Sequence, residues 1–155
     1  MHEMRRKDRR ISEEEALDLL KRCEYAVLAT VDAKDGSPYC VPVSPVYSDG
    51  CLYFHCARQG QKKDNIQNDT RVCLACVGAT ELLPEEFSTK YESVVVYGKA
   101  DFLTDKTEQI DALRKLCEKY ASSHMDRFDG EIAKSLSRTA VCRVRIEEIS
   151  GKAKR

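Results

Sequence analysis

The sequence predicts a mainly β fold, an antiparallel barrel of six strands with flanking helices. Six apolar runs have strand-like composition, and most of them are joined by short turns. Such hairpin connections favour an antiparallel sheet, because parallel strands need a long crossover segment between them. Amphipathic helical patterns occur at only a few places, which suits accessory helices outside a barrel. The strands are expected over residues 25–31, 39–47, 51–57, 71–77, 91–102 and 140–149.

An amphipathic helix is expected before the first strand, over residues 12–23. Ser12 suits the N-cap position and three glutamates follow it, while Lys21 and Arg22 occupy the last turn. This order of charges stabilises a helix through its dipole. Further helices are expected at three places: a short one after Gly60, a long one over residues 104–122, and another short one over residues 130–136.

Turn residues fix the start of the sheet. The Asp-Gly pairs at residues 35–36 and 49–50 lie between apolar runs and predict tight hairpin turns. The strand between them contains Pro42 and Pro45, which cannot donate a hydrogen bond to a neighbouring strand. We therefore expect an edge, a bulge or a bend in that strand. Gly98 predicts a similar irregularity in the strand over residues 91–102.

Length and charge exclude several classes of protein. The 155 residues are expected to form one domain, residues 1–155, in which residues 1–10 and 151–155 are flexible. Lys plus Arg and Asp plus Glu each total 26, which argues against a nucleic-acid binder that depends on bulk positive charge. No apolar stretch approaches the roughly 20 residues that span a bilayer, and no signal peptide is evident. We expect a cytoplasmic protein that binds neither nucleic acid nor membrane.

Eight cysteines lie along the chain, mostly inside apolar strand-like runs, where cysteine acts as a small buried hydrophobe. Cys73 and Cys76 have the spacing of a zinc or redox pair. A structural zinc site needs four ligands and no second such pair occurs, while a thioredoxin-type pair begins a helix. Residues three apart on a strand point to opposite faces. We therefore expect structural thiols and no metal site, with a zinc or thiol-redox protein as the alternative.

The segment after the third strand is the best candidate for a binding site. It passes through Gly60 and enters a helix that carries Lys62, Lys63 and Asn65. Backbone N–H groups at a helix start, joined by a lysine, form an anion site. Lys62, together with Arg58, would hold a phosphate by charge-assisted hydrogen bonds. The alternative for this pattern is a solvated basic turn.

Three segments carry a family resemblance. They are residues 23–31 with 36–43, residues 52–57 with the pattern Gly60-x-Lys62-x-x-Asn65-Ile66-x-x-Asn68, and residues 91–100. Together they resemble the FMN-binding split-barrel superfamily, which includes pyridoxamine 5′-phosphate oxidase, and within it the branch of the Nim-type nitroimidazole resistance proteins. The resemblance extends in order over roughly residues 4–149. It implies a six-stranded split β-barrel that binds FMN in a groove between the two subunits of a homodimer.

At the phosphate end of the flavin, the resemblance implies four residues. Ala29 and Thr30 would line the ribityl chain and the phosphate. Lys62 would bind the phosphate, and Asn65 would support that lysine. Ser93 and its strand would border the cofactor near the dimer interface.

Along the flavin ring, the resemblance implies two further segments. The backbone beside the ring would come from Val41, Pro42 and Val43. The wall leading to the phosphate would consist of Phe54, His55 and Cys56. A histidine of this strand is implicated near the flavin in the nitroimidazole resistance branch, which makes His55 the candidate catalytic residue. The alternative is an ordinary strand histidine bonded to a neighbour.

The resemblance implies an FMN-dependent oxidoreductase that reduces a small organic acceptor such as a nitro-aromatic, with NAD(P)H as a candidate donor. A non-catalytic flavin or haem storage protein on the same barrel is the alternative, because no residue stands out as a general acid or base. Pyridoxamine-phosphate oxidase carries a C-terminal motif of arginine and histidine, which residues 142–155 lack. We therefore do not expect that vitamin oxidase activity. His2 and His124 lie in polar stretches and carry no prediction.

Overall fold

Seven antiparallel strands form one curled sheet in the computed structural model, which describes residues 3–155. The order across the sheet is β2-β1-β5-β6-β7-β4-β3, with β2 and β3 at the two edges. These edges do not pair with each other, so hydrogen bonds do not close the barrel. The strands are β1 Ala26–Val31, β2 Pro38–Val43, β3 Val46–Ser48, β4 Cys51–Ala57, β5 Arg71–Leu83, β6 Ser88–Phe102 and β7 Thr139–Lys154.

The prediction of six strands is wrong at one position. The strand expected over residues 39–47 is divided at Ser44 and Pro45 into β2 and β3. The first half pairs with β1 and the second with β4, at opposite edges of the sheet. Pro45 has no N–H to continue a ladder, so the chain changes partner there. The mainly β, antiparallel class with flanking helices is confirmed.

The two predicted Asp-Gly turns differ in form. Asp49 and Gly50 both have positive φ, as a two-residue hairpin turn requires. The link between β1 and β2 spans residues 32–37, and only Gly36 has positive φ there. Between β6 and β7 the register shifts at Tyr97 and Gly98, the irregularity that Gly98 predicts. A Cβ atom at Gly98 would lie 2.2 Å from the carbonyl oxygen of Arg145, so only glycine fits at this crossing.

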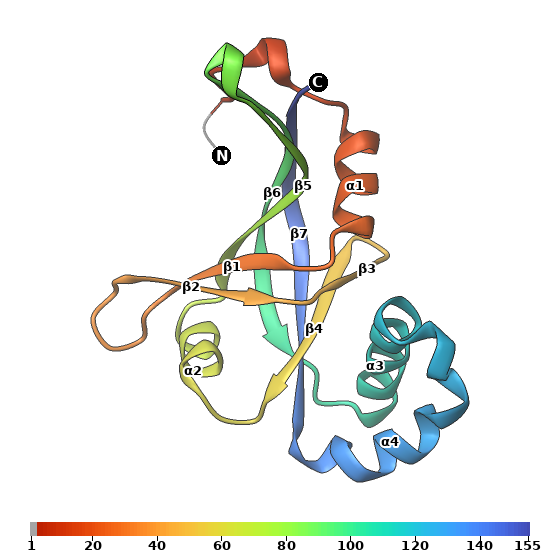
Figure 1. Cartoon of the computed structure of the whole chain (residues 1–155). Helices are drawn as coiled ribbons and strands as arrows, with labels where there is room; N and C mark the ends of the chain where they lie inside the picture. Colours follow the sequence, from red (N-terminus) through yellow and green to blue (C-terminus); the bar gives the residue numbers. More distant parts are fainter. Residues whose placement is uncertain (1–2) are drawn as a thin grey trace.

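The last three strands, β5, β6 and β7, extend beyond the ranges predicted from the sequence. The β5–β6 hairpin continues to a short 3-10 turn, Pro84–Glu86, and forms an arm that projects from the barrel (Figure 1). Residues 151–154, expected to be flexible, belong to β7 and pair with residues 91–94. Within the expected flexible N-terminus, Lys7–Arg9 form a 3-10 turn and Arg10 bridges to Lys152, while residues 1–2 lie outside the described part.

Four α-helices surround the sheet: α1 Glu13–Arg22, α2 Gln61–Asn68, α3 Lys106–Tyr120 and α4 Phe128–Ser135. Helix α1 has a capping box, in which Ser12 and Glu15 bond each other's backbone N–H. It lies along the β5–β6–β7 end of the molecule, whereas α3 and α4 lie at the opposite end (Figure 1). Helix α2 begins just after β4 and closes one mouth of the barrel (Figure 1).

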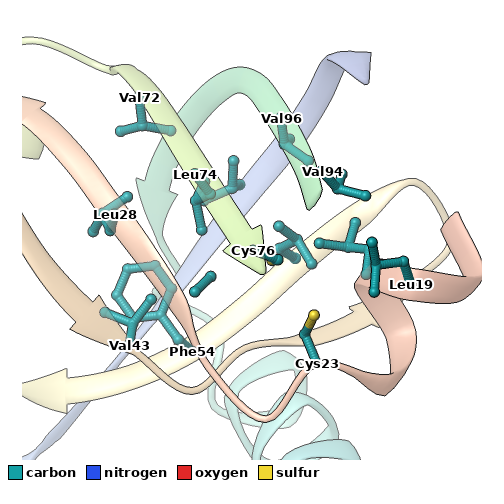
Figure 2. Close-up of a cluster of buried hydrophobic side chains, with 14 of the residues drawn as sticks. Leu19, Cys23, Leu28, Val43, Phe54, Val72, Leu74, Cys76, Val94 and Val96 are labelled. Carbon is teal, nitrogen blue, oxygen red and sulfur yellow. The ribbon is translucent and has the colours of Figure 1, made fainter. Parts of the chain in front are cut away.

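The interior of the barrel is filled by alternate side chains of the strands. Figure 2 shows side chains from β1, β2, β4, β5 and β6 meeting there, among them Leu28, Phe54, Leu74 and Val96. A second, smaller apolar cluster lies between β7 and the pair α3–α4. Helices α3 and α4 therefore cover the outer side of β4 and β7, whereas exposed apolar side chains remain on the outer side of β1, β5 and β6.

Candidate functional site

Helix α2 begins with unpaired backbone donors. Its first bonds run from the N–H groups of Lys63 and Asp64 to the carbonyl of Gly60, so the N–H groups of Gln61 and Lys62 precede the helical ladder. Gly60 has φ of 137°, a conformation that side-chain-bearing residues rarely adopt. It lets the chain turn from β4 into α2 within three residues.

Asn65 fixes this helix to the barrel. Its side chain is only 1% exposed and donates from Nδ2 to the Thr30 hydroxyl at 3.0 Å. Its Oδ1 accepts from the backbone N–H of Ala33 at 2.9 Å. Two of the predicted site residues, Thr30 and Asn65, are thus brought together and satisfy each other. Asn65 holds the middle of α2 against the end of β1.

Lys62 places a positive charge over the end of the barrel. Its ammonium lies 5.7 Å from the centre of the Phe54 ring. Among residues 3–155, no carboxylate lies within 4 Å of Lys62, Lys63 or Arg58. Burial raises the pKa of the Cys56 thiol, and the two nearby ammoniums oppose that shift. The site is a concentration of positive charge at a helix start, which attracts an anion.

The other predicted residues divide between two faces of the sheet. On β4, Phe54 and Cys56 turn toward the interior, whereas His55 is exposed on the outer side. On β1 and β2 the register pairs Ala29 with Cys40 and Leu28 with Val41. Four of the predicted site residues lie on the outer face of the sheet: Ala29, Pro42, His55 and Ser93. Val41 and Val43 turn toward the interior of the barrel.

His55 opens into a cavity of 530 Å³ between the outer side of β4 and the helices α3 and α4. Its wall is mainly apolar and includes Leu113, Leu116 and Phe128. His124 lines the same cavity, with its Nδ1 2.8 Å from the Ser123 hydroxyl. No pattern in the sequence indicates His124 as a site residue, because only the packing of α3 and α4 brings it near β4.

The outer face of β2, β1, β5 and β6 is apolar and uncovered. Tyr25 is 56% exposed, Val77 54% and Tyr97 41%, and Val27 is also exposed. Cross-strand pairing continues this face from Val27 to Ala75 on β5 and from Ala75 to Val95 on β6. Large apolar side chains gathered on one face mark an interaction surface. Ala29 and Ser93 belong to it.

Cys73 and Cys76 lie on opposite faces of β5, as the strand period predicts. Burial raises the pKa of Cys76 to about 12, so this thiol stays protonated at neutral pH. All eight cysteines are free thiols. Within the described residues, no three side chains of His, Cys, Asp or Glu are grouped to hold a metal ion.

The fold and this site define a split-barrel protein, and sequence comparison gives its family. The pattern of the pyridoxamine 5′-phosphate oxidase family matches residues 12–153. The chain belongs to that family, which confirms the resemblance carried by its three segments. A comparison with curated proteins gives no match. Across residues 3–155, no helix is long and apolar enough to cross a membrane.

Solved structures share the fold at low sequence identity. A proposed 5-nitroimidazole antibiotic resistance protein from Bacteroides thetaiotaomicron is 21% identical with a TM-score of 0.78, over 93% of this chain and 86% of that one. A FAD-binding protein from Mesorhizobium loti is 28% identical with a TM-score of 0.68, over 95% and 98%. The flavocytochrome Anf3 from Azotobacter vinelandii is 20% identical with a TM-score of 0.85, over 99% and 73%.

Proposed function

We propose that this chain is a flavoprotein that binds the FMN moiety of a flavin, with the phosphate at the start of α2. The Lys62 ammonium carries the proposal, because it has no acidic partner among the described residues and belongs to the first turn of α2, where the N–H groups of Gln61 and Lys62 precede the helical hydrogen bonds. A dianionic phosphate needs such a cation and such donors. Neighbours described as FAD-binding and as a flavocytochrome support a flavin.

The flavin ring would lie on the outer face of β1 and β2, between two copies of this chain. Ala29 and Pro42 offer apolar contacts there, and the β2 backbone at residues 41–43 offers hydrogen bonds to the polar edge of the ring. The exposed apolar side chains of the same face support a homodimer, since burying them stabilises association. Each groove would then be completed by the partner subunit.

The proposed activity is reduction of a small organic acceptor, with NAD(P)H as electron donor. A bound flavin supplies the redox chemistry. This chain's own residues would bind the cofactor, exclude water and position the acceptor. The apolar cavity beside His55 suits a planar aromatic acceptor such as a nitro-aromatic, and His55, which lines its wall, would be the catalytic residue. The Bacteroides neighbour supports this version of the function.

Replacement of Lys62 tests the phosphate site. We expect Lys62→Ala to weaken FMN binding at least about tenfold, because a charge-assisted hydrogen bond is lost. Circular dichroism should show an unchanged fold. Fluorescence titration of the apoprotein measures the affinity, and Lys134→Ala, an exposed lysine on the short helix α4, is the matched control. Unchanged affinity in Lys62→Ala would show that the phosphate lies elsewhere.

The colour of the purified protein tests the cofactor itself. We expect a yellow protein that releases one FMN moiety per subunit, and a colourless protein that fails to bind added flavin contradicts the proposal. NAD(P)H-dependent bleaching of the bound flavin, coupled to loss of a nitro-aromatic, tests turnover. Bound flavin that NAD(P)H cannot reduce would favour a storage role.

Haem storage is the second candidate, and one observation favours it. His55 and His124 both line the 530 Å³ cavity, and imidazole is a common ligand of haem iron. The flavocytochrome neighbour has the same fold. Addition of hemin to the purified protein tests haem binding. A Soret band that appears with wild type and is absent with His55→Ala supports haem storage, and the absence of a Soret band with wild type excludes it.

A further inference from the structure

A second cavity is lined by Lys63, the residue that follows Lys62. It has a volume of 520 Å³ and lies between α2, the end of β6 and the start of β7. Arg58, Lys63, Gln67 and Thr139 supply polar groups to its wall. It shares Arg58 with a neighbouring cavity of 660 Å³ beside α3 and α4. These volumes lie in the range of sites that bind small organic ligands.

The charge of this cavity favours an anion. Arg58 makes one long hydrogen bond, to the carbonyl of Leu136 at 3.4 Å, which leaves most of its donors free. Lys63 lies over the Phe102 ring at 5.5 Å. Among the described residues that line the cavity, only Asp101 is acidic.

Asp101 does not cancel these charges. Arg143 binds its carboxylate through two hydrogen bonds, at 3.1 and 2.7 Å, and Arg145 lies 3.4 Å away. The Arg143 guanidinium holds the pKa of Asp101 below its usual value. The aspartate is therefore neutralised by two arginines that do not line the cavity, and the field from Arg58 and Lys63 remains.

The ammonium groups of Lys62 and Lys63 lie over two different aromatic rings. Lys62 lies over Phe54 and Lys63 over Phe102. Phe54 and Phe102 both pair with Cys142 of β7, from its two sides. Their strands are thus two strand spacings apart, about 10 Å. A single phosphate bound at Lys62 would leave Lys63 and Arg58 without an anion. A ligand with a second phosphate could contact Lys62 with one phosphate, and Lys63 and Arg58 with the other.

We propose that Arg58 and Lys63 form a second anion subsite, which takes the second phosphate and the adenosine of a flavin dinucleotide. The inference rests on the proposed flavin function and deepens it, because it predicts that FAD binds more tightly than FMN. The Arg58 guanidinium can hold a phosphate with two parallel hydrogen bonds. Gln67 and Thr139 line the same cavity and can form hydrogen bonds with the polar groups of a nucleoside.

Titration of the apoprotein with riboflavin, FMN and FAD tests the subsite. We expect FAD to bind wild type at least about tenfold more tightly than FMN, as one charge-assisted contact would give. Arg58→Ala and Lys63→Ala should each lower FAD affinity about tenfold and lower FMN affinity by a clearly smaller factor, because FMN has no second phosphate for them to contact. Lys134→Ala should change neither, and Lys62→Ala should weaken both ligands.

Two results would overturn the subsite. In one, wild type binds FMN and FAD equally; in the other, Arg58→Ala and Lys63→Ala weaken FMN as much as FAD, which would make them part of a single phosphate site. If wild type binds no flavin at all, the proposed function fails, and ADP decides the subsite separately. ADP binding that requires Arg58 and Lys63 would still support it, and no ADP binding would overturn it.

Discussion

Asn65 shows how a single buried polar residue can position a charged neighbour. In our proposal the Lys62 ammonium can bind the phosphate only if α2 is held in place, and Asn65, one turn further along the helix, fixes α2 through Thr30 and Ala33. Buried polar groups at this junction are all satisfied, since no buried side-chain N or O atom of the described residues lacks a partner. Asn65 is therefore a positioning residue in our proposal.

Replacement of Asn65 should destabilise the fold and loosen α2. Asn65→Ala would leave the Thr30 hydroxyl and the Ala33 N–H without partners in a buried place, at a cost of about 2 kcal/mol in the free energy of unfolding. Urea denaturation followed by circular dichroism measures this loss. Asn68→Ala, at the exposed end of the same helix, is the control and should change stability by less than about 0.5 kcal/mol. Equal effects of the two variants would contradict the positioning role.

Residues whose role depends on local chemistry were predictable from the sequence. The lysine after Gly60 marks the helix start, and Cys73 and Cys76 separate to opposite faces because a strand has a period of two. The contact of His124 with the cavity of His55 was not predictable, because it depends on where two helices pack after the chain has passed through β6.

At the scale of helices and strands too, features set by local sequence could be predicted, and features set by distant contacts could not. The capping box of α1 and the Asp-Gly turns are encoded within a few residues. The division between β2 and β3 depends instead on which distant strand each half meets, β1 or β4. Residues 151–154 contain two lysines and a glycine, so nothing local marks them as a strand, and only pairing with β6 makes them one.

Gly98 is essential to the crossing of β6 and β7. We expect Gly98→Ala to lower the free energy of unfolding by about 1–3 kcal/mol, because the added methyl would overlap the backbone carbonyl of Arg145. Gly130→Ala is the matched control, since nothing lies within 4 Å of its Cβ position in α4 and alanine favours a helix. Thermal unfolding of both variants gives the comparison, and a neutral Gly98→Ala would show that the strands can shift apart.

At the scale of the whole molecule, the apolar outer face of the sheet is exposed to solvent in a single chain. It joins Tyr25, Val27, Val77 and Tyr97 across the β1–β5–β6 part of the sheet. The predicted ring-binding residues adjoin it, so our proposal makes cofactor binding and subunit association parts of one event. Ligand affinity should then depend on protein concentration.

A charge placed on this face should separate the subunits. We expect Tyr97→Lys to weaken dimerisation at least about 100-fold, because an unpaired ammonium would be buried in an apolar interface. FMN affinity should fall with it. Sedimentation equilibrium measures the association, and Ala133→Lys, on the exposed side of α4, is the control. A dimer of undiminished strength in Tyr97→Lys would place the interface elsewhere.

The link between β2 and β3 has a mechanical consequence. Only Ser44 and Pro45 join the two edges of the sheet, so the edges can separate no further than this short tether permits. The carbonyl of Pro45 also accepts hydrogen bonds from the Lys119 ammonium at 2.8 Å and the Tyr120 hydroxyl at 2.6 Å. The C-terminal end of α3 is therefore fixed to the link between β2 and β3. If α3 slides along its axis, it must either move this link or break the hydrogen bonds to Pro45.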